Sequence, residues 1–177
     1  SGDRIAHLRE VYQADPAWDA PDDPALQRRF ERVKAKLFGY QQKPQRTLQV
    51  YPETMSGIPA RYARAYAWHK DAQMDRALAE TDALLAAAPD DPYFLELKGQ
   101  ILLESGQPEA ALGPLRRASE LTRHQPLIAS MFGHALIATE NRDHFEEAEQ
   151  VLRAAVARDR LNPFAWYQLG VVYAARG

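Results

Sequence analysis

The sequence predicts an all-α fold, a solenoid of stacked helical hairpins, and three observations support this prediction. Ala, Leu, Glu, Gln and Arg, which favour helices, dominate every long segment. No alternation of apolar and polar residues with a period of two lasts long enough to indicate a strand. Segments of similar sequence also recur at an interval of 34 residues, which is typical of stacked repeats.

The composition limits what this chain of 177 residues can be. With 46% hydrophobic and 26% charged residues, it suits one globular domain or a short array of stacked units. The formal net charge of -2 provides no overall attraction to nucleic acid, so we expect no such partner. The absence of cysteine excludes disulfides and thiolate metal sites. The longest apolar run, Ala83 to Ala88, is too short to insert into a membrane.

Residues 1–23 are expected to form a short helix and a linker, an N-terminal extension of the solenoid. Asp3 is a candidate N-cap, and Ile5 and Leu8 would share one face of this helix. The stretch "ADPAWDAPDD" that follows is rich in Pro and Asp, as expected of a linker. Regular helical structure is therefore predicted to resume after residue 23.

Residues 24–57 are expected to form a degenerate helical hairpin that caps the solenoid. Asp23 is a candidate N-cap, and Pro24 occupies the first helical position, where proline is well tolerated. A short second helix is predicted to end before Pro52. The basic run from Arg28 to Lys36 is interpreted as an ordinary solvated face rather than a docking patch for anions.

Residues 58–177 contain the repeats. When the copies are aligned, Gly99, Gly133 and Gly170 fall in register. The first interval is 34 residues and the second is 37, because three extra residues enter the turn around residues 140–144. The same interval counted back from Gly99 reaches Ala65, inside a further copy. We therefore predict three full hairpins followed by the first helix of a fourth.

Further residues share the register of these glycines. The last copy carries Trp166, Leu169, Gly170 and Tyr173 in its first half, and small residues recur in the second halves at Ala77, Ala111 and Ala148. This pattern resembles that of the tetratricopeptide repeat (TPR) family. The resemblance implies a right-handed superhelix of helical hairpins that binds proteins or peptides. The pattern is broken at Thr81, Lys98, Arg123 and Arg160.

We find no self-contained active site in the sequence. It contains no HExxH motif, phosphate-binding glycine loop, serine nucleophile elbow or cysteine nucleophile. His69 and His134 fall near the inner face of the array, but a zinc ion shared by them would have to bridge two repeats. We therefore expect this chain to have no enzymatic activity and no cofactor of its own.

The TPR resemblance implies a binding site on the first helix of each hairpin, where positions two, five, nine and twelve line the concave surface. An aromatic groove with few charges suits an extended or helical segment with apolar side chains. The Lys, Arg and Asn with which some TPR proteins clamp a terminal carboxylate are absent from these positions, so we expect no such clamp. As an alternative, neighbouring helices or the N-terminal segment would cover some of the rings. The predicted groove residues are Tyr62, Tyr66, His69, Tyr93, Glu96, Gln100, Leu127, Ser130, His134, Phe164 and Tyr167.

A second resemblance covers nearly the whole chain. In this order, "SGDRIAHLRE", "DPALQRRFERVKAKLFGY" and "DDPYFLELKGQILLESG" are similar to the C-terminal part of bacterial periplasmic zinc metalloproteases of the BepA (YfgC) kind, relatives of HtpX and the CaaX proteases. Ser1, Arg4 and Ile5 match the Ser-x-x-Arg-Ile segment that closes the catalytic domain in that family. The HExxH helix and its zinc ion would belong to a protease domain outside this chain.

This second resemblance implies a non-catalytic TPR domain of a secreted zinc metalloprotease, with residues 1–23 as the end of the protease domain. It implies a periplasmic location, and partners among client proteins of outer-membrane quality control or in the chain's own protease domain. Two alternatives stay open. One is a free-standing TPR adaptor, and the other is a docking module that regulates its own protease.

The closing segment "NPFAWYQLGVVYAARG" has the pattern of a first helix without its partner. A first helix in a TPR array buries apolar residues against the second helix of its own hairpin. We therefore expect Gly177 to be a boundary rather than the natural C-terminus, and the side that includes Leu169, Val172 or their neighbours to be uncovered. Such a face could pair two copies of the chain in a homodimer.

Overall fold

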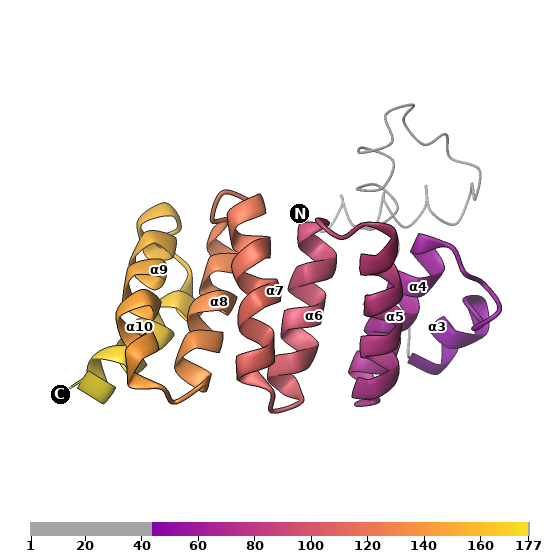
Figure 1. Ribbon diagram of the computed structural model, residues 1–177, viewed down its shortest axis with the longest axis horizontal. Coiled ribbons are helices and arrows are strands. Elements are labelled where there is room, and N and C mark those ends of the chain that lie inside the picture. Colours follow the sequence, from indigo (N-terminus) through magenta and orange to yellow (C-terminus); the bar gives the residue numbers. More distant parts are fainter. Residues whose placement is uncertain (1–43, 177) are drawn as a thin grey trace.

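The computed structural model describes residues 44–176, whose helices stand side by side in one row from α3 to α10 (Figure 1). Every regular element in this range is helical, which confirms the predicted all-α solenoid. The predictions for residues 1–43, namely the N-terminal helix, the linker and the first helix of the capping hairpin, lie outside the described residues. The helices are α3 (Pro44–Val50), α4 (Ile58–Lys70), α5 (Met74–Ala87), α6 (Pro92–Glu104), α7 (Pro108–Leu121), α8 (Pro126–Ala138), α9 (Phe145–Arg158) and α10 (Pro163–Arg176).

Three hairpins follow one another, α4/α5, α6/α7 and α8/α9, and α10 packs against both α8 and α9. Five of the described helices begin at a proline: α3, α6, α7, α8 and α10. The fixed φ of proline suits the first helical position, where its missing N–H costs no intrahelical hydrogen bond. The Asp91 side chain caps α6 by accepting hydrogen bonds from the backbone N–H groups of Tyr93 and Phe94, at 3.0 and 3.3 Å. The helix starts are thus encoded locally.

Close packing within the hairpins depends on small residues. The predicted contact alanines, Ala77, Ala111 and Ala148, are completely buried. A Cβ atom added to Gly99 would lie 2.3 Å from Cγ of Leu115, and one added to Gly133 would lie 2.6 Å from Cγ of Leu152. No side chain larger than a hydrogen atom fits in either place without moving the leucine. The aligned glycines are therefore sites where one helix receives a leucine of the next.

Each hairpin turn contains one residue in the left-handed region, and these residues recur at the repeat interval. They are Ala72 with φ 56°, Gly106 with φ 71° and Glu140 with φ 56°. Glycine adopts this conformation without steric cost, whereas other residues lose roughly 1–2 kcal/mol there. The three extra residues predicted in this region form a 3₁₀ turn, η1 (Arg142–His144), immediately before α9.

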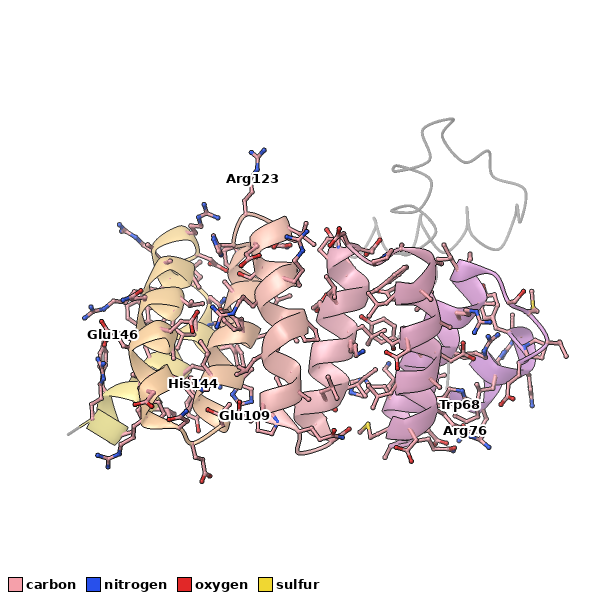
Figure 2. All side chains as sticks on the ribbon, in the orientation of Figure 1. Trp68, Arg76, Glu109, Arg123, His144 and Glu146 are labelled. Carbon is pink, nitrogen blue, oxygen red and sulfur yellow. The ribbon has the colours of Figure 1, made fainter. Side chains whose placement is uncertain are left out.

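The core lies between the helices along the whole row. One apolar cluster joins α4, α5 and α6 and includes Tyr62, Trp68 and Phe94. A second runs from α6 to α10 and includes Leu115 and Leu152. At the edge of the first cluster, the guanidinium carbon of Arg76 lies 4.6 Å from the centre of the Trp68 ring. Figure 2 labels both residues.

Arg64 anchors the loop before α4, a role that its sequence position does not predict. Its side chain is 1% exposed. Its Nε and Nη2 donate to the two carboxylate oxygens of Glu80, at 2.6 and 3.1 Å. Its Nη1 donates to the carbonyl oxygens of Pro52 and Met55, at 2.8 and 2.7 Å. Because a buried charge is tolerated only when it is paired and hydrogen-bonded, this arrangement fixes the loop against α4 and α5.

Candidate functional site

A groove of about 430 Å³ is formed by residues of α6, α8 and α10, the first helices of successive hairpins. Five of the predicted site residues line it: Glu96, Gln100, Leu127, His134 and Phe164. Three further lining residues were missed in the sequence: Leu103, Glu104 and Met131. Each of these follows a predicted residue by three or four positions and so shares its helix face, a spacing that would have identified them. We call this recess the α6–α8–α10 groove.

The apolar part of the groove lies at the starts of α8 and α10. Leu127 is 53% exposed and Phe164 is 36% exposed, although both carry large apolar side chains. The imidazole ring of His134 meets the Phe164 ring edge-on, with 5.6 Å between the ring centroids. This contact orients Phe164. Met131, which also lines the groove, adds a flexible and polarisable side chain.

The polar part of the groove lies at the end of α6, around Glu104. One carboxylate oxygen of Glu104 is 2.6 Å from Nε2 of His69, and the other accepts a hydrogen bond from the side-chain amide of Gln100 at 3.1 Å. The side chain of Glu104 nevertheless remains 48% exposed. The described lining residues include two carboxylates, Glu96 and Glu104, and neither lysine nor arginine. Glu96 is the fifth residue of α6 and is only 5% exposed, so the exposed carboxylate is that of Glu104 at the end of the helix. The groove therefore exposes an acidic group around Glu104 and apolar side chains around Leu127 and Phe164.

Tyr62 and Tyr66 do not line this groove, which corrects the prediction for both. Their exposed fractions are 1% and 3%. Their rings meet edge to face with 5.1 Å between centroids, and the Tyr62 ring lies 5.4 Å from that of Phe94 on α6. The alternative that such rings are covered is the correct one here. The aromatic cluster belongs to the core at the α4 end of the row.

Ser130 is also a structural residue rather than a groove residue. It is completely buried. Its hydroxyl donates to the carbonyl oxygen of Pro126 at 2.6 Å and accepts from the side-chain amide of Asn162 at 3.2 Å. Asn162 in turn accepts from the backbone N–H of Ala165 at the start of α10. Ser130 therefore ties α8 to the beginning of α10.

The corrections for Tyr62 and Ser130 have one physical cause, which is that position five of each copy faces the next hairpin. Tyr62 contacts Phe94 of the following hairpin, and Ser130 contacts Asn162 just before α10. Tyr62, Glu96 and Ser130, all at this position, are exposed by 5% or less. Tyr167 stands at the same position in α10 and is 69% exposed. Position five is thus covered wherever a further helix follows among the described residues.

The remaining predicted residues lie at the margins. Tyr93 is half-buried on α6 and is not a lining residue of the α6–α8–α10 groove. His69 reaches the groove only indirectly, through its contact with Glu104. Within residues 44–176, no three His, Cys, Asp or Glu side chains gather closely enough to hold a metal ion. No helix in this same part of the chain has the length and apolar character needed to cross a membrane.

The uncovered side of α10 is formed by neighbours of Leu169 and Val172, which was one of the two expected outcomes. Leu169 and Val172 themselves are buried in the cluster shared with α9. The large apolar side chains that α10 exposes are Phe164 at 36%, Trp166 at 53%, Tyr167 at 69% and Tyr173 at 45%. A Cβ atom added to Gly170 would meet nothing within 4 Å, unlike those at the upstream glycines. Pairing of two chains through this face stays a prediction.

No family model matches the chain, and no curated protein does so either. The chain is similar to the structure of YrrB, described as a TPR protein with an unusual peptide-binding site, at a TM-score of 0.67 and 22% identity over 97% of this chain and 83% of that one. It is similar to MamA (41-end) from Desulfovibrio magneticus RS-1, at a TM-score of 0.71 and 18% identity over 84% and 85%. Against another MamA structure the TM-score is 0.58 at 22% identity, and the match spans 63% of this chain but only 60% of that one.

These similarities are evidence about the fold of the chain and not about its function. At such identities they establish that the chain is a TPR-like α-solenoid, as predicted, and leave its function to be argued from the site. The resemblance to periplasmic metalloproteases receives no support from them.

Proposed function

We propose that the chain is a protein-interaction module that binds a peptide segment in the α6–α8–α10 groove. The observation that carries the proposal is the joint exposure of Leu127 and Phe164 in a recess of about 430 Å³. A recess of this size is typical of ligand sites, and apolar side chains gathered on a surface mark interaction sites. The description of YrrB as a peptide-binding TPR protein supports the same class of function for this fold.

A display selection with random twelve-residue peptides tests the proposal. The displayed peptides carry flanking residues at both ends, so that binding cannot depend on a free terminus. We expect the selection on the wild-type chain to enrich peptides whose affinity falls at least tenfold on a Leu127→Ala, Phe164→Ala double variant. The physical reason is that truncating two apolar anchors removes contact area at the centre of the site.

The matched control removes exposed apolar side chains elsewhere. Leu161 is 90% exposed and Trp166 is 53% exposed, and neither lines the groove. A Leu161→Ala, Trp166→Ala double variant should therefore retain the selected peptides. If the selected peptides bind the groove variant and the wild type equally, or if nothing is enriched, the proposed site is wrong.

We also propose a finer assignment that rests on the sequence resemblance alone. The chain would be the TPR domain of a periplasmic zinc metalloprotease, for which it recruits or positions clients, while the protease domain holds the zinc. The supporting residues, Ser1, Arg4 and Ile5, lie outside the described residues. The encoding gene tests this: an HExxH motif and a secretion signal upstream of Ser1 support it, and an open reading frame without HExxH leaves the free-standing adaptor.

A further inference from the structure

We propose that the α6–α8–α10 groove selects an internal segment of a partner protein in which a basic side chain and an apolar side chain stand about five residues apart. The basic side chain binds beside Glu104, and the apolar one binds over Leu127 and Phe164. This inference rests on the peptide-binding function proposed above, and it specifies the chemistry of the peptide.

The charge of the groove favours a basic partner segment. The described lining residues contribute the carboxylates of Glu96 and Glu104 and no side chain with a permanent positive charge. A cation that enters such a recess is attracted, and a carboxylate is repelled, more strongly than on an open surface, because water is partly excluded. A basic peptide is therefore favoured over an acidic one.

The carboxylate of Glu104 has the capacity to accept a further hydrogen bond. The two oxygens of a carboxylate offer about four acceptor positions. The contacts with His69 and Gln100 occupy two of these, at 2.6 and 3.1 Å, and hold the carboxylate in one orientation. With 48% of its side chain exposed, Glu104 can accept a further charge-assisted hydrogen bond from an incoming Lys or Arg.

The opposite end of the groove favours an apolar side chain. Leu127 and Phe164 are partly exposed, and the edge-on contact with His134 positions the Phe164 ring. Covering such a pre-positioned apolar surface costs little conformational entropy and removes apolar area from water. An apolar side chain of the peptide gains most at this end, because Leu127 and Phe164 are exposed there whereas Glu96, the charged lining residue in the first half of α6, is only 5% exposed.

The spacing follows from helix geometry. Glu104 is the thirteenth residue of α6 and Leu127 is the second of α8, so they differ by eleven positions in helix register. Successive first helices run in the same direction, because each hairpin returns the chain to its starting end. Eleven positions correspond to roughly 16 Å along the axis, and neighbouring helices are about 9 Å apart. An extended segment spans the diagonal, roughly 18 Å, with about five or six residues.

The experiment compares synthetic probes by fluorescence anisotropy. Each probe is a twelve-residue Gly/Ser peptide with an acetylated N-terminus and an amidated C-terminus. The basic probe carries two lysines and, five residues further on, a Leu-Phe pair. The acidic probe has two glutamates in place of the lysines, and the adjacent probe places the lysines directly beside the Leu-Phe pair. At about 0.05 M salt we expect the basic probe to bind about tenfold more tightly than either of the others, with the charge preference shrinking as salt is added.

Two variants distinguish the contribution of the Glu104 charge to peptide binding from that of a surface charge outside the groove. Glu104→Gln should weaken binding of the basic probe about fivefold, because it removes the charge but keeps the shape. Glu109→Gln is the matched control. Glu109 is an exposed residue at the start of α7 and is labelled in Figure 2. It is not among the residues that line the groove. The control variant should leave the affinity unchanged. Thermal unfolding of both variants shows that the fold is retained.

Equal affinity for the basic and acidic probes overturns this inference. If that shared affinity is then lost in Phe164→Ala, the proposed peptide-binding function survives without the charge preference. Equal affinity for the basic and adjacent probes overturns the spacing. If the basic probe does not bind at all, the inference is overturned, and the display selection decides the proposed function independently.

Discussion

The side chain at position five of the repeat is buried at one end of the helix row and exposed at the other. Tyr62 near the start of α4 and Tyr167 in α10 are equivalent in the repeat, yet their exposed fractions are 1% and 69%. Tyr62 packs on Phe94 of the next hairpin, whereas no described helix follows α10. In a solenoid the neighbouring repeat decides whether a position is covered. An aromatic residue at a given position is therefore not by itself evidence of a binding site.

The ends also differ in how they hold buried carboxylates. Glu80 at the α4 end and Glu149 beside α10 are each 12% exposed, and each binds two arginines. At the α4 end one of these arginines, Arg64, is 1% exposed and also holds backbone carbonyl groups. At the α10 end both arginines are exposed, by 65% and 43%. The α4 end is closed by a satisfied polar network, and the α10 end is open.

We expect the largest difference in folding stability between variants at position five of the two ends. Tyr62→Ala should lower the free energy of unfolding by about 3–5 kcal/mol, because it leaves a cavity in the cluster that contains Tyr66 and Phe94. Tyr167→Ala should change it by less than about 0.5 kcal/mol, since the ring is largely solvated. Urea denaturation of both variants measures this difference. Similar losses for the two variants would contradict the description of the two ends.

The matched carboxylates provide the second prediction. Arg64→Met should lower the free energy of unfolding by about 3 kcal/mol, because Glu80 and the carbonyl groups of Pro52 and Met55 lose a buried charged donor. Arg153→Met at the open end should cost less than about 1 kcal/mol, as for other exposed ion pairs. Thermal unfolding of the two variants tests this, and an equal decrease in Tm would remove the distinction between the two networks.

The aligned glycines provide the third prediction. Gly99→Ala should destabilise the chain by about 1–2 kcal/mol, because the new methyl group overlaps the buried Leu115 side chain. Gly170→Ala should stabilise it by about 0.5–1 kcal/mol, because alanine favours the helix and nothing stands in its way. Opposite signs in urea denaturation are the expected result. Destabilisation by Gly170→Ala would show that this glycine is covered in solution.

Much of the fold could be predicted from the sequence, because the repeat encodes it locally. The helix starts at proline, the contact alanines and the aligned glycines all follow from spacing and residue size. The position of the insertion around Glu140 was also predictable, since it shifts the register by three residues. Arg64 was not predictable, because nothing in its spacing distinguishes a buried cation from a solvated one.

The candidate site was only partly predictable, because the neighbouring repeat covers part of the helix face that the sequence indicates. Gln100, His134 and Phe164 were found because they occupy positions that the next hairpin leaves open. Tyr62 and Ser130 were misassigned because contacts with the next hairpin, which pair residues more than thirty positions apart in sequence, cover position five. Glu104 was missed because it lies beyond position twelve, at the last residue of α6. Helix periodicity finds the face, but the neighbouring repeat decides which part of it is accessible.

The most direct test of where the site lies is a nuclear magnetic resonance titration of the ¹⁵N-labelled chain with the basic probe. If the peptide binds in the α6–α8–α10 groove, the largest amide shift changes will fall on Gln100, Leu103, Met131 and His134. Tyr62 and Trp68 at the α4 end should not respond, because their side chains are buried in the core. Shift changes centred on α4, or on the second helices α5, α7 and α9, would contradict the proposed site.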